Sequence, residues 1–171
     1  MTGIDVRGER PDDAEAIRTV TREAFAGAPH ADGSEPVIPE RLRESGALTL
    51  SLVAEAGGDV VGHVAASPVA IASDGPPRDG WFGIGPLSVR PDMQRRGVGT
   101  ALMGACLAEM REAGAAGCVL IGDPGYYGRF GFASNAALDY AGVPSAYVLA
   151  LPFGDDRPEG TLHFDPAFGG A

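Results

Sequence analysis

Short runs of apolar and β-branched residues recur along the chain, and their spacing predicts a series of β-strands. The runs occupy residues 4–7, 48–55, 59–72, 81–89, 118–121, 143–151 and 161–164. Gly57 and Gly58 separate the second run from the third, which is a strong signal for a β-hairpin. The run 118–121 is apolar at every position, as expected for a strand that is covered on both faces.

Apolar residues three or four positions apart predict three helices. The first starts near Pro11 with Asp12 as its cap, and the second covers residues 39–44. The third starts at Val98 and ends at Gly114. Its apolar stripe, which should pack on a sheet, comprises Val98, Leu102, Met103, Cys106, Leu107 and Met110. Residues 30–38 are polar and contain glycine, so they predict a loop between the first two helices.

The order strand, helix, strand between residues 81 and 121 predicts a right-handed crossover that joins two parallel strands. Gly85 and Pro86 interrupt the first of these strands. Because proline cannot donate to a sheet ladder, we expect a bulge or a splayed edge at that point. A ligand should bind at the C-terminal ends of the two strands.

A glycine-containing turn at residues 94–100 leads into the third helix. Gly97 and Gly99 let the backbone approach a ligand closely, and the unpaired N–H groups of a helix start attract phosphate. Arg95 and Arg96 add positive charge at the same place. The same residues are also compatible with an ordinary strand-to-helix turn whose arginines are solvated and bind no ligand. A dinucleotide-binding fingerprint is excluded because its third glycine is missing, and the Gly-Lys-Ser/Thr of a P-loop does not occur.

The composition indicates a globular protein, and we expect one domain over residues 1–171. A net charge of −10 argues against nucleic acid as a partner and fits a cationic small molecule or a peptide amine. Cys106 and Cys118 lie in apolar segments, so we expect buried reduced thiols, and no metal-ligand spacing is visible. The sequence shows neither a membrane-spanning run nor a signal peptide, so we expect a cytoplasmic protein without a membrane partner.

Two motifs resemble the signature of the GNAT N-acetyltransferase superfamily. Leu87-Ser88-Val89 followed by Gln94-x-x-Gly97-x-Gly99 resembles its acetyl-CoA-binding element. Tyr126-Tyr127-Gly128-Arg129-Phe130-Gly131-Phe132 resembles its Tyr-x-x-x-Gly-Phe element, with Tyr127 at the tyrosine position. The resemblance, to a small single-domain bacterial-type member, implies an α/β (α+β) fold. A mixed central sheet of about six to seven strands would be flanked by helices, with a splayed parallel pair at the cofactor site.

The resemblance also implies acetyl-CoA as co-substrate, without a metal. The residues expected at the cofactor are Leu87, Ser88, Val89, Gln94, Arg95, Arg96, Gly97, Val98, Gly99 and Thr100. The backbone of Leu87 and Val89 would pair with pantetheine, and a backbone N–H there would polarise the thioester carbonyl. The turn 95–100 would hold the pyrophosphate.

Tyr127 is the candidate catalytic residue, a general acid that protonates the departing thiolate. The aromatic richness of its segment leaves a packing role open for Tyr127 and favours one for Tyr126. The motif strand carries no carboxylate, so Glu55, His63 and Asp123 remain candidates for the general base, with a water chain as the default. A role within the sheet is favoured for His63 and a capping role for Asp123.

These features predict an acetyltransferase that moves an acetyl group from acetyl-CoA to a primary amine of a small molecule or peptide by direct attack. A non-catalytic acyl-CoA-binding regulatory protein is the alternative. An adaptor without a ligand would require the glycine turn to be accidental. We expect a monomer or a homodimer.

Overall fold

A computed structural model of the protein describes residues 3–28, 31–76 and 78–168. The first residue of the predicted 30–38 loop and both ends of the predicted 1–171 domain lie outside the described residues. The strands of the large sheet are β1 (Asp5–Gly8), β2 (Leu50–Ala56), β3 (Asp59–Pro68), β5 (Trp81–Val89), β6 (Gly117–Ile121), β7 (Ala133–Ser134) and β9 (Val148–Pro152). A small sheet contains β4 (Ala70–Ala72), β8 (Leu138–Asp139) and β10 (Gly160–His163). The α-helices are α1 (Ala14–Phe25), α2 (Ile38–Ser45), α3 (Val98–Glu112) and α4 (Pro124–Tyr127).

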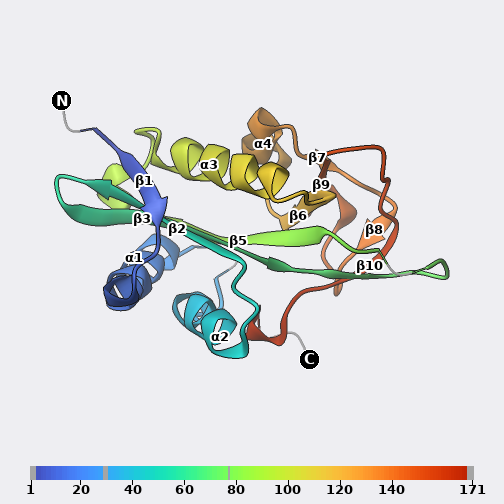
Figure 1. The fold of residues 1–171 in the computed structure, drawn as a ribbon, viewed down its shortest axis with the longest axis horizontal. Coiled ribbons are helices and arrows are strands. Elements are labelled where there is room, and N and C mark those ends of the chain that lie inside the picture. The colour runs from blue at the N-terminus through green and yellow to red at the C-terminus, as the bar shows by residue number, and fades with distance from the viewer. Residues whose placement is uncertain (1–2, 29–30, 77, 169–171) are drawn as a thin grey trace.

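The seven strands of the large sheet lie in the order β1-β2-β3-β5-β6-β9-β7. Neighbouring strands pair antiparallel, except that β5 and β6 run parallel and are joined through α3. Figure 1 shows α3 and α4 above the sheet and α1 and α2 below it. The mixed sheet flanked by helices, the number of strands and the parallel crossover therefore confirm the predicted fold class.

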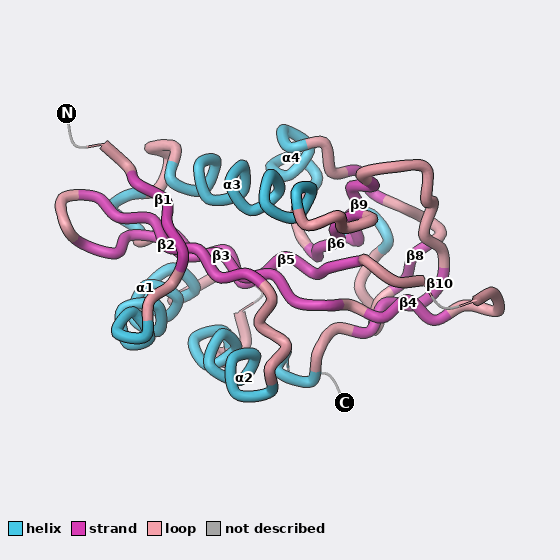
Figure 2. The backbone as a smooth tube through the Cα atoms, in the orientation of Figure 1, coloured by secondary structure: helices cyan, strands magenta, loops and turns pink. Residues whose placement is uncertain are grey.

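The small sheet, in the order β4-β10-β8, lies at one end of the large sheet (Figure 2). Two of the predicted strands differ from the structure. The run 59–72 is not one strand, because the chain leaves the large sheet after Pro68, which cannot continue a ladder as a donor, and β4 joins the small sheet. The run 143–151 is a strand only from Val148, where β9 begins, because a 3-10 turn occupies Ser145–Tyr147. The run 161–164 is a strand as predicted and forms β10 of the small sheet.

The start of the first helix is capped by a different residue from the one predicted. A 3-10 turn at Pro11–Asp13 precedes α1, and the Asp13 carboxylate accepts a hydrogen bond from the backbone N–H of Arg10 at 2.6 Å. Asp12 is exposed and makes no such bond. Asp13 is buried and also pairs with Arg7 at 2.7 Å. Arg7 in turn binds Glu55, which lies 48 residues further along the chain, so a distant contact holds Arg7 and Asp13 in place. The prediction of Asp12 was wrong because sequence alone does not show which carboxylate meets Arg7.

The bulge predicted in the motif strand is present. Between the cross-strand pairs Val64–Leu87 and Ala66–Ile84, one residue of β3 faces two residues of β5, Gly85 and Pro86. On its other edge β5 pairs with β6 only from Trp81 to Gly83. From Ile84 onward, the two parallel strands of the described chain therefore part, which leaves an edge of β5 available to an extended ligand.

Helix α3 covers the centre of the sheet with its apolar stripe. All six residues of the predicted stripe are buried, and they share one core with residues of β2, β3, β6 and β9. The helix lies close to β3 because Gly62 has no side chain. A Cβ at Gly62 would lie 2.8 Å from Leu102 Cδ1 and 2.8 Å from Val98 Cγ1. This close approach holds the start of α3 against β3.

We expect Leu102→Ala to lower the free energy of unfolding by about 2–5 kcal/mol, because it removes a fully buried side chain and leaves a cavity between α3 and the sheet. Glu109→Ala on the exposed face of α3 should change it by less than about 0.5 kcal/mol. Urea denaturation of the three proteins measures both effects. Equal losses in the two variants would contradict this packing of α3.

Candidate active site

A cleft of about 630 Å³ lies between the end of β5, the start of α3 and α4. Seven of the ten residues predicted at the cofactor line it: Leu87, Val89, Gln94, Arg95, Gly97, Gly99 and Thr100. These residues come from the strand end, the glycine turn and the first turn of the helix. The fold therefore brings the two halves of the predicted acetyl-CoA element to one cleft.

The glycine turn has a backbone that favours glycine. Gly97 is the N-cap of α3 with φ +87°, and Arg95 has φ +63°. The Gln94 side chain donates to the carbonyl of Val89 at 3.1 Å, which ties the turn to the end of β5. A Cβ on Gly99 would lie 2.7 Å from the Tyr126 hydroxyl. The turn thus presents the free N–H groups of a helix start to the cleft with little side-chain obstruction.

The three other predicted cofactor residues do not line the cleft. Ser88 is fully buried opposite His63 on β3, and Val98 packs in the core against Gly62. Arg96 is exposed. Ser88 and Val98 therefore have only backbone groups to offer a ligand in the cleft.

The sequence did not predict one of the charged residues of the cleft. Arg129 lines the cleft, where its Nε donates to the carbonyl of Tyr126 at 2.9 Å and its guanidinium lies 4.3 Å from the centre of the Tyr126 ring. With Arg95 it supplies positive charge in an acidic chain, as a phosphate-containing ligand requires. The signal was its place in the aromatic motif, two positions after Tyr127.

Tyr127 lies at the end of α4, which follows directly after β6. Its ring is 4.9 Å from that of Tyr126 and 6.3 Å from that of Phe132, both in edge-on orientations. Burial raises the pKa of the Tyr127 phenol to about 12, and the neighbouring Tyr126 adds to this shift. The residue is packed by aromatic neighbours, yet it also lines the cleft. The position of Tyr127 is therefore compatible with both roles that the sequence left open, the general acid and the aromatic packing residue.

A second cavity of about 310 Å³ adjoins the cleft. The two share Phe25, Leu87 and Tyr127 as lining residues, so Tyr127 stands where they meet. The second cavity also contains two carboxylates, Asp32 and Glu35, from the loop before α2. These acids were not singled out from the sequence, which predicted only a loop at residues 30–38.

The three candidate bases are engaged elsewhere, and none of them lines either cavity. Glu55 accepts from Arg7 Nε at 2.9 Å, and Asp123 caps α4 by accepting from the N–H of Gly125 at 2.8 Å, as predicted. His63 is fully buried on the face of the sheet opposite α3, and its Nε2 lies 2.7 Å from the Ser51 hydroxyl. The predicted sheet role of His63 therefore agrees with its position.

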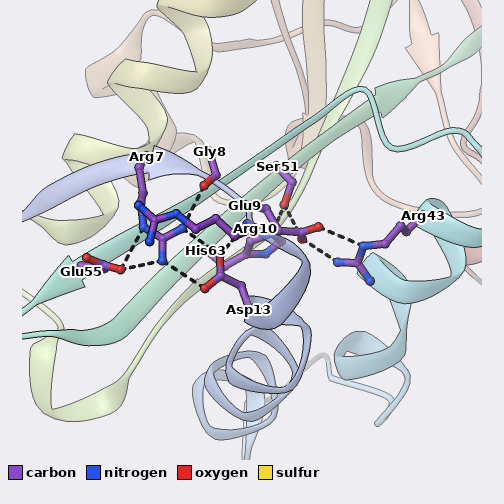
Figure 3. Close-up of polar contacts among 9 residues, drawn as sticks. All are labelled: Arg7, Gly8, Glu9, Arg10, Asp13, Arg43, Ser51, Glu55 and His63. Atoms are coloured by element: carbon purple, nitrogen blue, oxygen red, sulfur yellow. Dashed lines mark hydrogen bonds and ion pairs between the residues drawn. The ribbon is translucent and has the colours of Figure 1, made fainter.

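Figure 3 shows the polar network that surrounds His63. The Ser51 hydroxyl donates to Glu9 at 2.9 Å, and Glu9 in turn pairs with Arg43 of α2. Burial lowers the pKa of the His63 ring to about 4. His63 is neutral at pH 7 as a result. The network joins Glu9, which directly follows β1, with β2, β3 and α2 beneath the sheet.

Comparison with known families matches residues 5–134 to the model described as "Acetyltransferase (GNAT) domain". The chain belongs to the GNAT acetyltransferase family. It is 35% identical over 149 residues to the uncharacterized N-acetyltransferase YhbS of Escherichia coli K12, with 84% of each chain covered. No helix within the described residues has the length and apolar character needed to cross a membrane.

Two solved GNAT structures resemble the chain over nearly its whole length. A GNAT acetyltransferase from Brucella melitensis, crystallised with acetyl-CoA, has a TM-score of 0.84 and 46% identity and covers 97% of this chain and 98% of its own. YhbS from Escherichia coli, crystallised with CoA, has a TM-score of 0.88 and 30% identity, and the match covers 99% of this chain and 93% of YhbS. Within the described residues no group of three or more His, Cys, Asp or Glu side chains could hold a metal ion.

The position of His63 predicts how stability depends on pH. The pKa of His63 is about 4 in the folded chain and 6.5 in the unfolded chain. Between these two pH values the unfolded chain therefore binds a proton at His63 that the folded chain does not bind. Stability from this residue is therefore complete above pH 6.5 and is lost as pH falls, by about 2 kcal/mol between pH 7 and pH 5.

Urea denaturation at pH 7 and pH 5 measures this loss in the wild type and in His63→Gln. The variant should lose about 2 kcal/mol less, since the other titratable groups are the same in both proteins. Equal losses would mean that His63 titrates normally, which would contradict its burial within the sheet.

Proposed function

We propose that this GNAT family member transfers the acetyl group of acetyl-CoA to a primary amine of a small molecule or peptide by direct attack. The observation that carries the proposal is the meeting of two cavities at Leu87 and Tyr127. One contains the glycine turn, and the other contains carboxylates suited to a cationic amine. The binding of acetyl-CoA by the Brucella melitensis relative supports the choice of donor.

The cofactor would occupy the cleft through both backbone and charged groups. Beyond Gly83 the edge of β5 that has parted from β6 is available to the amides of pantetheine as a short extra strand. The pyrophosphate would lie at the start of α3, where Gly97 and Gly99 keep the approach clear, with Arg95 and Arg129 beside it. The thioester would then lie where the strands part.

The transfer forms one bond and breaks one. The amine nitrogen attacks the thioester carbonyl, a backbone N–H of β5 stabilises the oxyanion, and the carbon–sulfur bond breaks. Tyr127, kept protonated by its raised pKa, donates its proton to the departing sulfur. The proton that the amine loses restores the phenol through water, so the products are an amide and free CoA.

Direct attack is favoured over an acetylated cysteine. Cys106 and Cys118 are both free and fully buried, and burial raises the pKa of each thiol to about 12. Neither lines the cleft or the second cavity. The same two free thiols support the cytoplasm as the compartment that we propose.

We propose the whole chain, residues 1–171, as the unit of this activity. The family model ends at residue 134, whereas Tyr140, Phe164 and Phe168 of the second cavity lie beyond it. Residues beyond the family model therefore contribute to the proposed acceptor site.

A glycine substitution tests the cofactor site. Gly97→Ala should weaken acetyl-CoA binding about tenfold, because φ +87° costs an L-residue about 1–2 kcal/mol and the turn must shift to relieve it. Gly104→Ala is the matched control, since it places a Cβ in open space on the exposed face of α3. Arg96→Ala should also have little effect. Titration calorimetry measures all three affinities, and unchanged binding in Gly97→Ala would remove the turn from the site.

Tyr127→Phe tests the proposed general acid. It should keep the affinity for acetyl-CoA and lower kcat by about 10²–10⁴-fold, the usual range for a lost general acid. Tyr147→Phe, an exposed residue that lines neither cavity, should turn over like the wild type. CoA release from acetyl-CoA in the presence of primary amines is the measurement. Wild-type turnover in Tyr127→Phe would make it a packing residue, and binding without any CoA release would favour the regulatory protein.

A further inference from the structure

The second cavity has a wall of aromatic rings. Tyr140, Phe164 and Phe168 all line it and are half-buried. The ring centres of Tyr140 and Phe164 are 5.0 Å apart, and those of Phe164 and Phe168 are 5.5 Å apart. Phe25 at the end of α1 lines the same cavity. The rings of Tyr140, Phe164 and Phe168 therefore form one continuous surface.

The wall is fixed in place by the large sheet. A Cβ on Gly83 would lie 2.5 Å from Phe164 Cε1, so the absence of a side chain at this position of β5 lets the Phe164 ring lie directly against the strand. Gly83 is also the last residue of β5 that pairs with β6. The aromatic wall thus begins where the parallel strands part, beside the proposed position of the thioester.

The loop before α2 supplies negative charge to the same cavity. Glu35 accepts from the backbone N–H groups of Asp32 and Gly33, both at 3.1 Å, and Asp32 accepts from the Ser34 N–H at 2.8 Å. These bonds hold both carboxylates at the cavity. The Ser34 hydroxyl lowers the pKa of Asp32, so this carboxylate is charged at neutral pH. The described lining residues include neither arginine nor histidine, which leaves the cavity with a negative and apolar character.

We propose, on the basis of the acetyltransferase function above, that the acceptor is a small primary amine that carries an aromatic ring on a short alkyl chain. The carboxylates attract its ammonium group, the ring stacks on the aromatic wall, and the amine reaches the thioester beside Tyr127. A volume of about 310 Å³ is near the lower limit of ligand cavities and fits such a molecule.

The experiment compares kcat/KM for three acceptors by CoA release at saturating acetyl-CoA. The acceptors are 2-phenylethylamine, n-butylamine and a short peptide with a free N-terminus and one lysine. The sequence itself contains no lysine, so the enzyme's own side chains cannot act as competing acceptors. We expect 2-phenylethylamine to exceed both others at least tenfold.

Two variants assign the preference to the cavity. Phe168→Leu should raise KM for 2-phenylethylamine about five- to tenfold and change that for n-butylamine less than twofold, since it removes a ring but keeps apolar volume. Glu35→Gln should raise KM for both amines and leave acetyl-CoA affinity unchanged. Phe153→Leu is the control, because this half-buried ring lies under Arg111 and lines neither cavity.

The outcomes separate the two proposals. A faster reaction with the peptide or with n-butylamine, or equal effects of Phe168→Leu on both amines, would overturn the aromatic acceptor and leave acetyl transfer standing. Binding of acetyl-CoA with no CoA release for any acceptor would overturn the transfer proposal and this inference with it.

Discussion

The parting of β5 from β6 after Gly83 is the constraint on which the rest of the structure depends. Parallel strands joined by a crossover helix normally continue side by side, but here they pair over three residues only, Trp81 to Gly83. The bulge at Gly85 and Pro86 keeps β5 paired with β3 while its other edge opens. The helix start, α4 and the Phe164 ring then all lie around the same gap, since each follows or contacts one of the two strands.

Charge is divided between the two faces of the sheet. On the face opposite α3, arginines are paired with carboxylates: Arg7 with Asp13 and Glu55, and Arg43 with Glu9. In the proposed cofactor cleft, Arg95 and Arg129 are both lining residues. In a chain of net charge −10, this arrangement places two arginines in one cleft and leaves the adjoining cavity acidic.

Local sequence patterns predicted the parts of the fold that depend on residues close together in the chain. The stripe of α3, the Gly57-Gly58 hairpin and the bulge at Pro86 were predictable because helical period, turn chemistry and the missing N–H of proline act within a few positions. The end of β3 and the two-residue strands β7 and β8 were not, since they are too short for a period or depend on partners far along the chain.

The candidate site divides in the same way. Its glycine turn and Tyr127 belong to motifs. The contact of His63 with Ser51 and the presence of Glu35 and Phe164 in one cavity, in contrast, need the assembled fold. The two cavities share a wall that consists of Phe25, Leu87 and Tyr127. A ligand that shifts this wall from one cavity therefore changes the affinity of the other cavity for its own ligand. Linkage then makes the effect reciprocal: any factor by which the donor tightens the acceptor is the factor by which the acceptor tightens the donor.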